Sequence, residues 1–340
     1  IDNAAPATNG IRSIDYILTP GTEQTGENQS NYMGVLADNS VNFTADFGFT
    51  QKYSLGNRVW FDTDNSSTIN GSEVGIDGVT VNLYTAGNLT TIVATDTTTN
   101  GGYYLFDDLY PGDYVVSVAA SNFGGVLNGY LSSATSISNA GVVSETTAAL
   151  SNSDTDSDDN GTLQTGGTLN GAVISSTVTL GPNGNTEPAN ETDLETGVGQ
   201  GNQVNGRANM TVDFGFYTMT LGNLVWSDTD KNGAFNGGET GIDGLTVELW
   251  SGDGTTQLAS TTTAGGGLYS FPALVQGNYT VRVTAPTGTV SSLDSFAPAD
   301  TTNPTTNTDN NDNGVGTGGG TIASNGVTLT PGLAQTSSIV

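Results

Sequence analysis

Two acidic segments have the spacing of a calcium-binding loop. The more complete one covers residues 228–239 and matches the pattern D-x-[DN]-x-[DN]-G-x5-E in full. In such a loop, Ca²⁺ takes oxygen ligands from side chains at positions 1, 3 and 5, a backbone carbonyl at 7, a group at 9 and a glutamate at 12. We therefore predict a Ca²⁺ site in this second acidic loop, with the ligands Asp228, Asp230, Asn232, Ala234, Asn236 and Glu239.

The first acidic loop, residues 62–73, repeats this spacing with weaker ligands. Ser67 stands at the sixth position, where the pattern has glycine, and Ser66 is a weaker ligand than Asn or Asp. Because Asp and Asn also cap turns without a metal, a solvated turn is the alternative interpretation. Two loops in matching register, each ending in glutamate, favour calcium. The predicted ligands are Asp62, Asp64, Ser66, Thr68, Asn70 and Glu73.

Two further acidic runs occur later in the chain, at residues 154–161 and, more thinly, at 307–314. Carboxylates at alternate positions of an extended chain share one face, which suits a further Ca²⁺ ion. A disordered acidic loop is the alternative interpretation. The candidate ligands are Asp154, Asp156, Asp158, Asp159, Asp309 and Asp312.

The composition excludes several other kinds of chemistry. The chain has no Cys and no His, so thiol catalysis, Ser-His-Asp triads, ordinary zinc sites and disulfides are ruled out. With 6 basic and 34 acidic residues, the net charge of −28 repels phosphate backbones and attracts cations, so we predict no nucleic-acid partner. No apolar stretch approaches the roughly 18–20 residues of a membrane span. The carboxylates have calcium-loop spacing and are not an isolated pair in a cleft, so we predict no enzyme.

Internal repeats divide the chain into three units. Residues 55–60 (LGNRVW) recur as residues 221–226 (LGNLVW), and the sequence Asp-Phe-Gly-Phe occurs at residues 46–49 and again at 213–216. From these landmarks we predict that residues 1–50 are the C-terminal part of a first repeat, 51–217 a complete calcium-binding repeat, and 218–340 a repeat that lacks its last strand.

The elements that must position the acidic loops are predicted to be β-strands. Short runs with β-branched and aromatic residues indicate strands at 79–84, 103–106, 114–118 and 173–180, and a closing strand is expected over 41–49. Turn residues separate these runs, and no sustained helical period is found. Each acidic loop follows a tryptophan, Trp60 or Trp226, that is expected to fill the core. The predicted fold is all-β, with tandem antiparallel β-sandwich domains.

These motifs together resemble the B-repeat family of serine-aspartate-repeat bacterial surface adhesins. The resemblance is carried by Leu-Gly-Asn-x-Val-Trp, the Asp-x-Asp loop, Glu-x-Gly-Ile-Asp-Gly-x-Thr-Val, Gly-x-Tyr-x-Phe and the closing Asp-Phe-Gly-Phe. It implies Cna-B-like (prealbumin-like) sandwiches that bind calcium at the acidic loops and runs and serve as rigid stalk segments. Related collagen-adhesin domains carry a Lys-to-Asn cross-link. Here Lys52 lies near a first strand but its counterpart is Thr218, so no such cross-link is inherited.

The predicted function is structural. We expect an extracellular protein of the cell surface, or a secreted filament, in which calcium-rigidified sandwiches form a stalk or filament. Its expected partners are copies of itself or adjacent repeats, arranged end to end, including by β-strand addition. The alternative is an adhesin module that binds a host protein or glycan.

Overall fold

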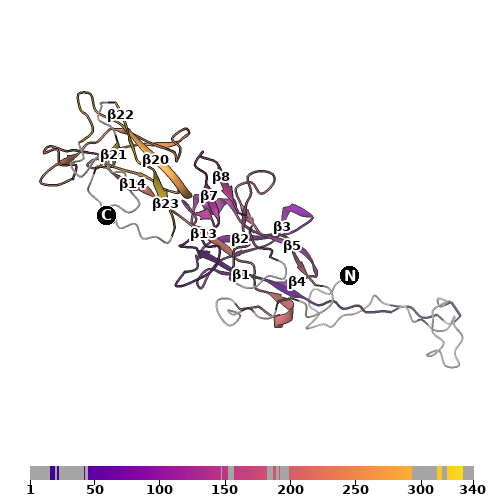
Figure 1. Ribbon diagram of the computed structural model, residues 1–340. Helices are drawn as coiled ribbons and strands as arrows, with labels where there is room; N and C mark the ends of the chain where they lie inside the picture. The colour runs from indigo at the N-terminus through magenta and orange to yellow at the C-terminus, as the bar shows by residue number, and fades with distance from the viewer. Residues whose placement is uncertain are drawn as a thin grey trace. The chain divides into compact units, whose positions relative to one another are not determined.

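The structure is a computed structural model (Figure 1). It describes residues 16–19, 21–22, 42, 45–146, 148–151, 157–181, 187–188, 191, 199–292, 312–315 and 320–331. The chain forms two compact units, Ile1–Thr50 and Gln51–Val340. No helix in these described segments has the length and hydropathy of a membrane span.

In the first unit, residues 45–50 lie outside any strand and are exposed. The strand predicted over residues 41–49 is therefore not found in the described part of this segment, and residues 41, 43 and 44 lie outside that part. Phe47 and Phe49 of the Asp-Phe-Gly-Phe sequence are 50% and 78% exposed.

The second unit begins with a sandwich of two sheets, here called the first sandwich (residues 51–217). One sheet has the order β12-β1-β13-β6, with β4 also paired to β1. The other has the order β3-β2-β5-β10-β9, with β11 also paired to β5. The strands are β1 (Tyr53–Phe61), β2 (Thr80–Thr85), β3 (Asn88–Thr97), β4 (Tyr103–Leu109), β5 (Gly112–Val118), β6 (Leu131–Ser132), β9 (Thr162–Leu163), β10 (Val173–Ile174), β11 (Val178–Leu180), β12 (Ala208–Asn209) and β13 (Phe214–Tyr217). Two short 3₁₀ helices, η2 (Ala120–Gly124) and η3 (Asn205–Arg207), lie in the connections.

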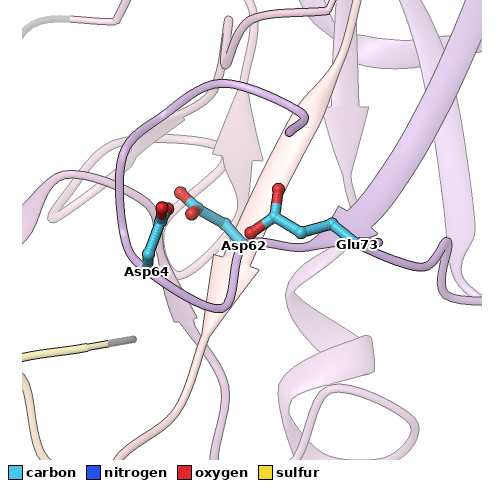
Figure 2. A group of neighbouring side chains, drawn as sticks. All are labelled: Asp62, Asp64 and Glu73. Carbon is cyan, nitrogen blue, oxygen red and sulfur yellow. The ribbon is translucent and has the colours of Figure 1, made fainter. Parts of the chain in front are cut away.

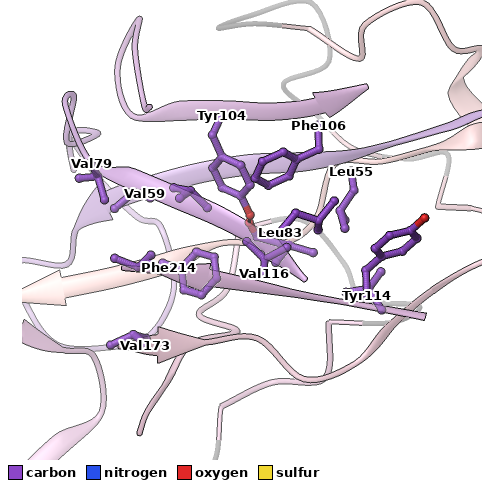
Figure 3. Packing of buried hydrophobic residues seen from close by; sticks show 14 of the residues in the cluster. Leu55, Val59, Val79, Leu83, Tyr104, Phe106, Tyr114, Val116, Val173 and Phe214 are labelled. Carbon is purple, nitrogen blue, oxygen red and sulfur yellow. Dashed lines mark hydrogen bonds between the residues drawn. The ribbon is translucent and has the colours of Figure 1, made fainter. Parts of the chain in front are cut away.

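Apolar side chains from both sheets of the first sandwich meet between them (Figure 3). Val59 of β1, Tyr104 of β4 and Phe214 of β13 face Leu83 of β2 and Val116 of β5, and all five are buried. Alternation along each strand sends these residues inward, and their burial supplies most of the driving force for folding. This core holds the end of β1, from which the first acidic loop departs.

A second sandwich (residues 218–331) follows. Its strands are β14 (Leu221–Leu224), β15 (Trp226–Ser227), β16 (Thr240–Gly241), β17 (Thr246–Ser251), β18 (Gln257–Thr262), β19 (Leu268–Phe271), β20 (Gln276–Thr284), β21 (Gly314–Val315), β22 (Thr321–Ser324) and β23 (Val327–Leu329). The larger sheet has the order β18-β17-β20-β22-β21, with β23 on β20. The strands β7 (Thr135–Ile137) and β8 (Val143–Glu145), which form a hairpin in the chain of the first sandwich, also join this sheet.

The two tryptophans differ in their packing. Trp60 is fully buried, which confirms its predicted place in the core, and it lies against Gly215 of β13. Trp226 is half-buried and borders a cavity of about 270 Å³. The described residues of the second sandwich include no counterpart of β13, and the missing last strand of residues 218–340 stays a prediction.

The all-β, tandem antiparallel β-sandwich fold is confirmed, with two local differences. The strand predicted over 173–180 is split into β10 and β11, because the side chain of Ser175 takes the place of a backbone acceptor in the pairing with β5. Its hydroxyl accepts the Val116 N–H at 3.0 Å. In addition, β1 pairs in parallel with β12 and β13, and β20 pairs in parallel with β7, so both of these sheets are mixed.

Candidate metal centres

The first acidic loop brings three carboxylates together directly after β1. Figure 2 shows the side chains of Asp62, Asp64 and Glu73 converging, and each offers a carboxylate oxygen within 4.8 Å of the others. The loop is closed behind them, because the N–H of Phe61 donates to the Val74 carbonyl at 2.8 Å. The end of β1 therefore holds both ends of the loop.

Hydrogen bonds from the backbone set the direction of each carboxylate in this loop. Asp62 accepts the N–H groups of Ser66 (3.0 Å) and Ser67 (2.9 Å), one on each oxygen. Glu73 accepts the N–H groups of Thr63 (2.6 Å) and Asn70 (3.0 Å). Backbone donors of this kind favour the charged form of a carboxylate.

The second acidic loop repeats the main contacts of this arrangement. Asp228, Asp230 and Glu239 offer oxygens within 4.8 Å of one another. Asp228 accepts the Gly233 N–H at 2.9 Å, and Glu239 accepts the Thr229 N–H at 2.6 Å. The predicted ligands at positions 1, 3 and 12 are thus brought together in both loops.

The remaining predicted ligands lie beside these carboxylates. In the first loop, the Ser66 hydroxyl donates to the Thr68 carbonyl (3.2 Å), and the Asn70 amide donates to Ser66 (2.9 Å) and Asp64 (3.2 Å). In the second loop, the Asn236 amide donates to the Ala234 carbonyl (3.0 Å), and the Asn232 amide to Asp230 (2.8 Å).

The sixth position requires a left-handed backbone in both loops. Its φ is 61° at Ser67 and 72° at Gly233. This conformation is easy for glycine and costs other residues of order 1–2 kcal/mol. The sequence difference at this position therefore places strain in the first loop only.

Each of the two later acidic runs forms a backbone hydrogen bond with the sixth residue of one acidic loop. The N–H of Asp159 donates to the Ser67 carbonyl at 3.0 Å, and the N–H of Asp312 donates to the Gly233 carbonyl at 2.7 Å. Asp158 forms a β-bridge with Thr68. The described parts of these two runs therefore lie directly beside the acidic loops. Asp154, Asp156 and Asp309 lie outside the described residues.

Burial shifts the proton affinity of the carboxylates around the first loop. Burial, together with repulsion from Glu145 and Asp62, raises the pKa of Asp159 to about 8, against the opposing effect of hydrogen bonds from Gly215 and Gly161. Burial also raises the pKa values of Asp62 and Glu145. A bound cation would reverse these shifts, because it favours the charged forms.

The pKa values of the exposed Asp64 and the half-buried Asp228 shift in the opposite direction. A hydrogen bond from Ser66 lowers the pKa of Asp64. Slight burial opposes ionisation of Asp228, but hydrogen bonds from Gly233, Ser292 and other loop groups outweigh it, so its pKa is lowered. The first loop is therefore the more buried of the two, and the second is the more open.

Two acidic residues of this region were not predicted from the sequence. Asp213 is buried and accepts the Arg58 N–H at 3.0 Å. Its place in the repeated Asp-Phe-Gly-Phe sequence is the signal that could have identified it. Glu145 is half-buried and accepts the Leu163 N–H at 2.8 Å. No local spacing connects Glu145 with the loop.

The donor set fits calcium. It consists of carboxylate, hydroxyl, amide and carbonyl oxygens, the hard ligands that Ca²⁺ binds six to eight at a time. The clustered carboxylates of Asp62, Glu145 and Asp159, whose pKa values burial raises, supply a second reason for a cation at the first loop.

Sequence comparison identifies the family. The sequence model of the SdrD B-like domain matches residues 53–177 and again 219–329. These two matches cover most of the chain, and one falls within each sandwich.

Two relatives come from staphylococci. The chain is 31% identical over 281 residues to the serine-aspartate repeat-containing protein D of Staphylococcus aureus (strain Newman), covering 80% of this chain and 17% of that protein. It is 31% identical over 291 residues to the serine-aspartate repeat-containing protein F of Staphylococcus epidermidis, covering 84% of this chain and 13% of that protein. The chain thus spans less than a fifth of these relatives.

Among solved structures, a streptococcal ancillary pilin is similar, with 11% identity, a TM-score of 0.27 and coverage of 71% of this chain and 56% of that one. The resemblance that the repeated motifs predicted is confirmed by the family match. The chain belongs to the SdrD B-like domain family, and like its relatives it is an extracellular surface protein.

Proposed function

We propose that the two sandwiches are calcium-rigidified segments of an extracellular stalk or filament, joined head to tail. The observation that carries the proposal is the pair of acidic loops, whose carboxylates converge within 4.8 Å in each sandwich. Each loop follows the strand that carries the repeated tryptophan, β1 in the first sandwich and β15 in the second, so an ion there would fix the loop to the core.

Electrostatics gives calcium its effect in this proposal. Two carboxylates about 4 Å apart repel by about 4 kcal/mol at an effective dielectric constant near 20. A divalent ion between the carboxylates attracts both of them and so removes this repulsion. When the free concentration of the ion is about 100 times its Kd, binding stabilises a site by about 2.7 kcal/mol. That is a large share of a domain stability of about 5–15 kcal/mol.

Tandem repetition supports the head-to-tail arrangement. The chain leaves β13 at Tyr217 and enters β14 at Leu221, so only a few residues separate the two sandwiches. A short connection limits the relative motion of neighbouring domains and suits a load-bearing series. The partners in such a series are adjacent repeats or further copies of the chain.

Calorimetric titration and thermal unfolding of the full chain test this function. We expect calcium binding at millimolar or lower concentrations and a Tm in calcium about 5–10 °C above that in chelator, given about 2–4 °C per kcal/mol for domains of this size. Magnesium at the same concentration is the control, because it prefers a smaller octahedral site. A Tm that is the same in calcium and in chelator, with no binding heat, would overturn the proposal.

A further inference from the structure

We propose that the β7–β8 hairpin is a clamp between the two sandwiches and that the first acidic loop sets its position. The second part rests on the proposed calcium function. The partner of the hairpin is the next repeat of the same chain, which it contacts through its backbone, its apolar side chain and its turn.

The hairpin extends the sheet of the second sandwich. Its strand β7 pairs in parallel with β20, placing Ser136 opposite Gln276 and Ile137 opposite Gly277 (Figure 1). Ile137 is 9% exposed and belongs to the hydrophobic core of the second sandwich, together with Leu249. A side chain contributed by one repeat thus fills part of the core of the next.

The turn of the hairpin lies in a notch of the second sandwich. The Asn139 carbonyl accepts the Asp253 N–H at 2.9 Å, and its side-chain oxygen accepts the Asn278 amide at 2.6 Å. A Cβ added at Gly141 would contact the Cβ of Ser251 at 3.3 Å. Both walls of the notch, the β17–β18 turn and the start of β20, therefore hold the hairpin.

Gly277 makes this close approach sterically possible. A Cβ at this position would lie 2.3 Å from Cγ2 of Ile137 and 2.6 Å from its carbonyl oxygen. Gly112 occupies the corresponding place at the start of β5, with φ 158° against 155°. A Cβ at Gly112 would meet only the ring of Tyr114, at 3.8 Å. Gly277 and Gly112 thus have nearly the same backbone φ, but only Gly277 lies against the hairpin.

The first acidic loop contacts the base of the hairpin and the second sandwich at once. Asn65, at position 4 of the loop, accepts the Ala134 N–H at 2.7 Å and donates to the Gln276 side chain at 3.0 Å. Ser133, just before the hairpin, donates to Asp62 at 2.7 Å. A predicted calcium ligand and its loop neighbour therefore both hold the chain from which the hairpin extends.

Tyr217 also links the base of the hairpin to the second sandwich. Its hydroxyl donates to the Thr135 carbonyl and accepts the Gln276 N–H at 3.0 Å. Because Asn65 keeps a left-handed φ of 53°, its side-chain direction depends on the conformation of the whole loop. An ion that fixes the loop fixes Asn65, and with it the contact to Gln276.

The second acidic loop provides an internal control. Its residue at position 4 is Lys231, with a similar φ of 62°. Glycine accommodates this backbone in either loop. Asn65→Gly and Lys231→Gly therefore make comparable backbone changes, and only the first removes hydrogen bonds to the hairpin and to the second sandwich.

The test is a distance measurement by double electron–electron resonance on the full chain. The chain has no Cys, so Thr97→Cys in β3 and Ser260→Cys in β18, both exposed, place one spin label on each sandwich. We expect a narrow distance distribution in calcium and a broader one in chelator. Gly277→Ala is expected to broaden the distribution even in calcium, and Gly112→Ala to leave it narrow.

Asn65→Gly tests the connection with the acidic loop. It is expected to broaden the distribution in calcium while calorimetry still detects calcium binding, and Lys231→Gly is expected to keep the distribution narrow. If calcium binds and raises the Tm but Gly277→Ala and Asn65→Gly both behave as their controls, the clamp is refuted and the proposed function stands. If calcium neither binds nor raises the Tm, the proposed function fails, and a broad distribution with Gly277→Ala would still support the hairpin contact.

Discussion

At the residue scale, the first acidic loop combines a buried carboxylate with a left-handed backbone at Ser67, where the second loop has glycine. Asp62 is fully buried and hydrogen-bonded to Ser133, and its counterpart Asp228 is only half-buried. The first loop has the greater desolvation cost, and so the greater need for a cation, although Ser67 weakens its backbone geometry.

The strain at Ser67 leads to a first prediction. Ser67→Gly is expected to raise the free energy of unfolding by up to about 1 kcal/mol and to tighten calcium binding, because glycine adopts a φ of 61° without steric cost. Urea unfolding in chelator and calorimetry in calcium measure the two effects. The reciprocal change, Gly233→Ser, should have the opposite effect in the second loop. Equal stability of Ser67→Gly and the natural chain would show that position 67 is unstrained.

Asp159 leads to a prediction about pH. In chelator, the folded chain keeps the Asp159 proton up to a pKa of about 8, and the unfolded chain releases it near the ordinary value of 3.8. The folded state therefore binds more protons between these values, and stability must fall as pH rises from about 4 to about 8. Denaturant unfolding in chelator at pH 5 and pH 8 measures this decrease.

The matched variant for this measurement is Asp159→Asn, which cannot titrate. It is expected to flatten the decrease between pH 5 and pH 8, and the remaining slope belongs to Asp62, Glu145 and Glu187, whose pKa values burial also raises. The chain has no His to titrate in this window. A decrease of unchanged size in the variant would contradict the assignment to Asp159.

The sequence named six candidate ligands in each loop, because they follow a fixed spacing within twelve residues, and in both loops the structure brings the carboxylates at positions 1, 3 and 12 together. It did not predict Glu145 or Asp213. These residues reach the site only after the hairpin and β13 have packed, and tertiary contacts of that kind leave no local pattern. The position of Asp159 beside Ser67 was likewise invisible, since about ninety residues separate them.

At the scale of elements, a carboxylate fixes the segment that follows each acidic loop. Asp77 accepts the N–H groups of Gly101 (2.9 Å) and Gly102 (2.7 Å) in the β3–β4 turn. Asp243 accepts those of Gly266 (2.9 Å) and Gly267 (2.6 Å) in the same way. The repetition of this contact in both sandwiches indicates that the turn is needed to hold the returning end of the loop.

This contact gives a third prediction. Asp77→Ala is expected to lower the free energy of unfolding by about 2 kcal/mol, because it leaves two N–H groups without their charged acceptor. Asp77→Asn keeps one oxygen acceptor and should lose less. Urea unfolding of both variants, in calcium and in chelator, measures the difference. If the alanine and asparagine variants were equally stable, the hydrogen bonds to the turn would contribute nothing.

The strands themselves were largely predictable, because period-2 alternation and turn residues mark them locally. The split of the run at 173–180 and the parallel pairing of β1 were not, since both depend on partners far away in the chain. The β7–β8 hairpin shows the limit best: its alternation is short and polar, and its buried Ile137 has its core partners in the following repeat.

At the scale of the whole molecule, the net charge of −28 opposes compaction in both sandwiches. Monovalent salt screens this repulsion at every pair of charges, reducing the Debye length from about 10 Å at 0.1 M to about 3 Å at 1 M. Calcium at about 1 mM changes the ionic strength very little, and extracellular calcium modules bind in this range. Monovalent salt therefore acts by screening and calcium by binding at sites, and the two effects can be measured separately.

A fourth prediction follows from this separation. In chelator, the Tm of the full chain is expected to rise as NaCl increases from about 0.1 M to about 1 M. In about 0.1 M NaCl, 1 mM calcium should raise the Tm further, by site binding. The double variant Asp62→Asn with Asp228→Asn is expected to lose the response to calcium and keep the response to NaCl. If both responses were lost together, or if the double variant still responded to calcium, the stabilisation would come from general charge neutralisation and the two acidic loops would not be its source.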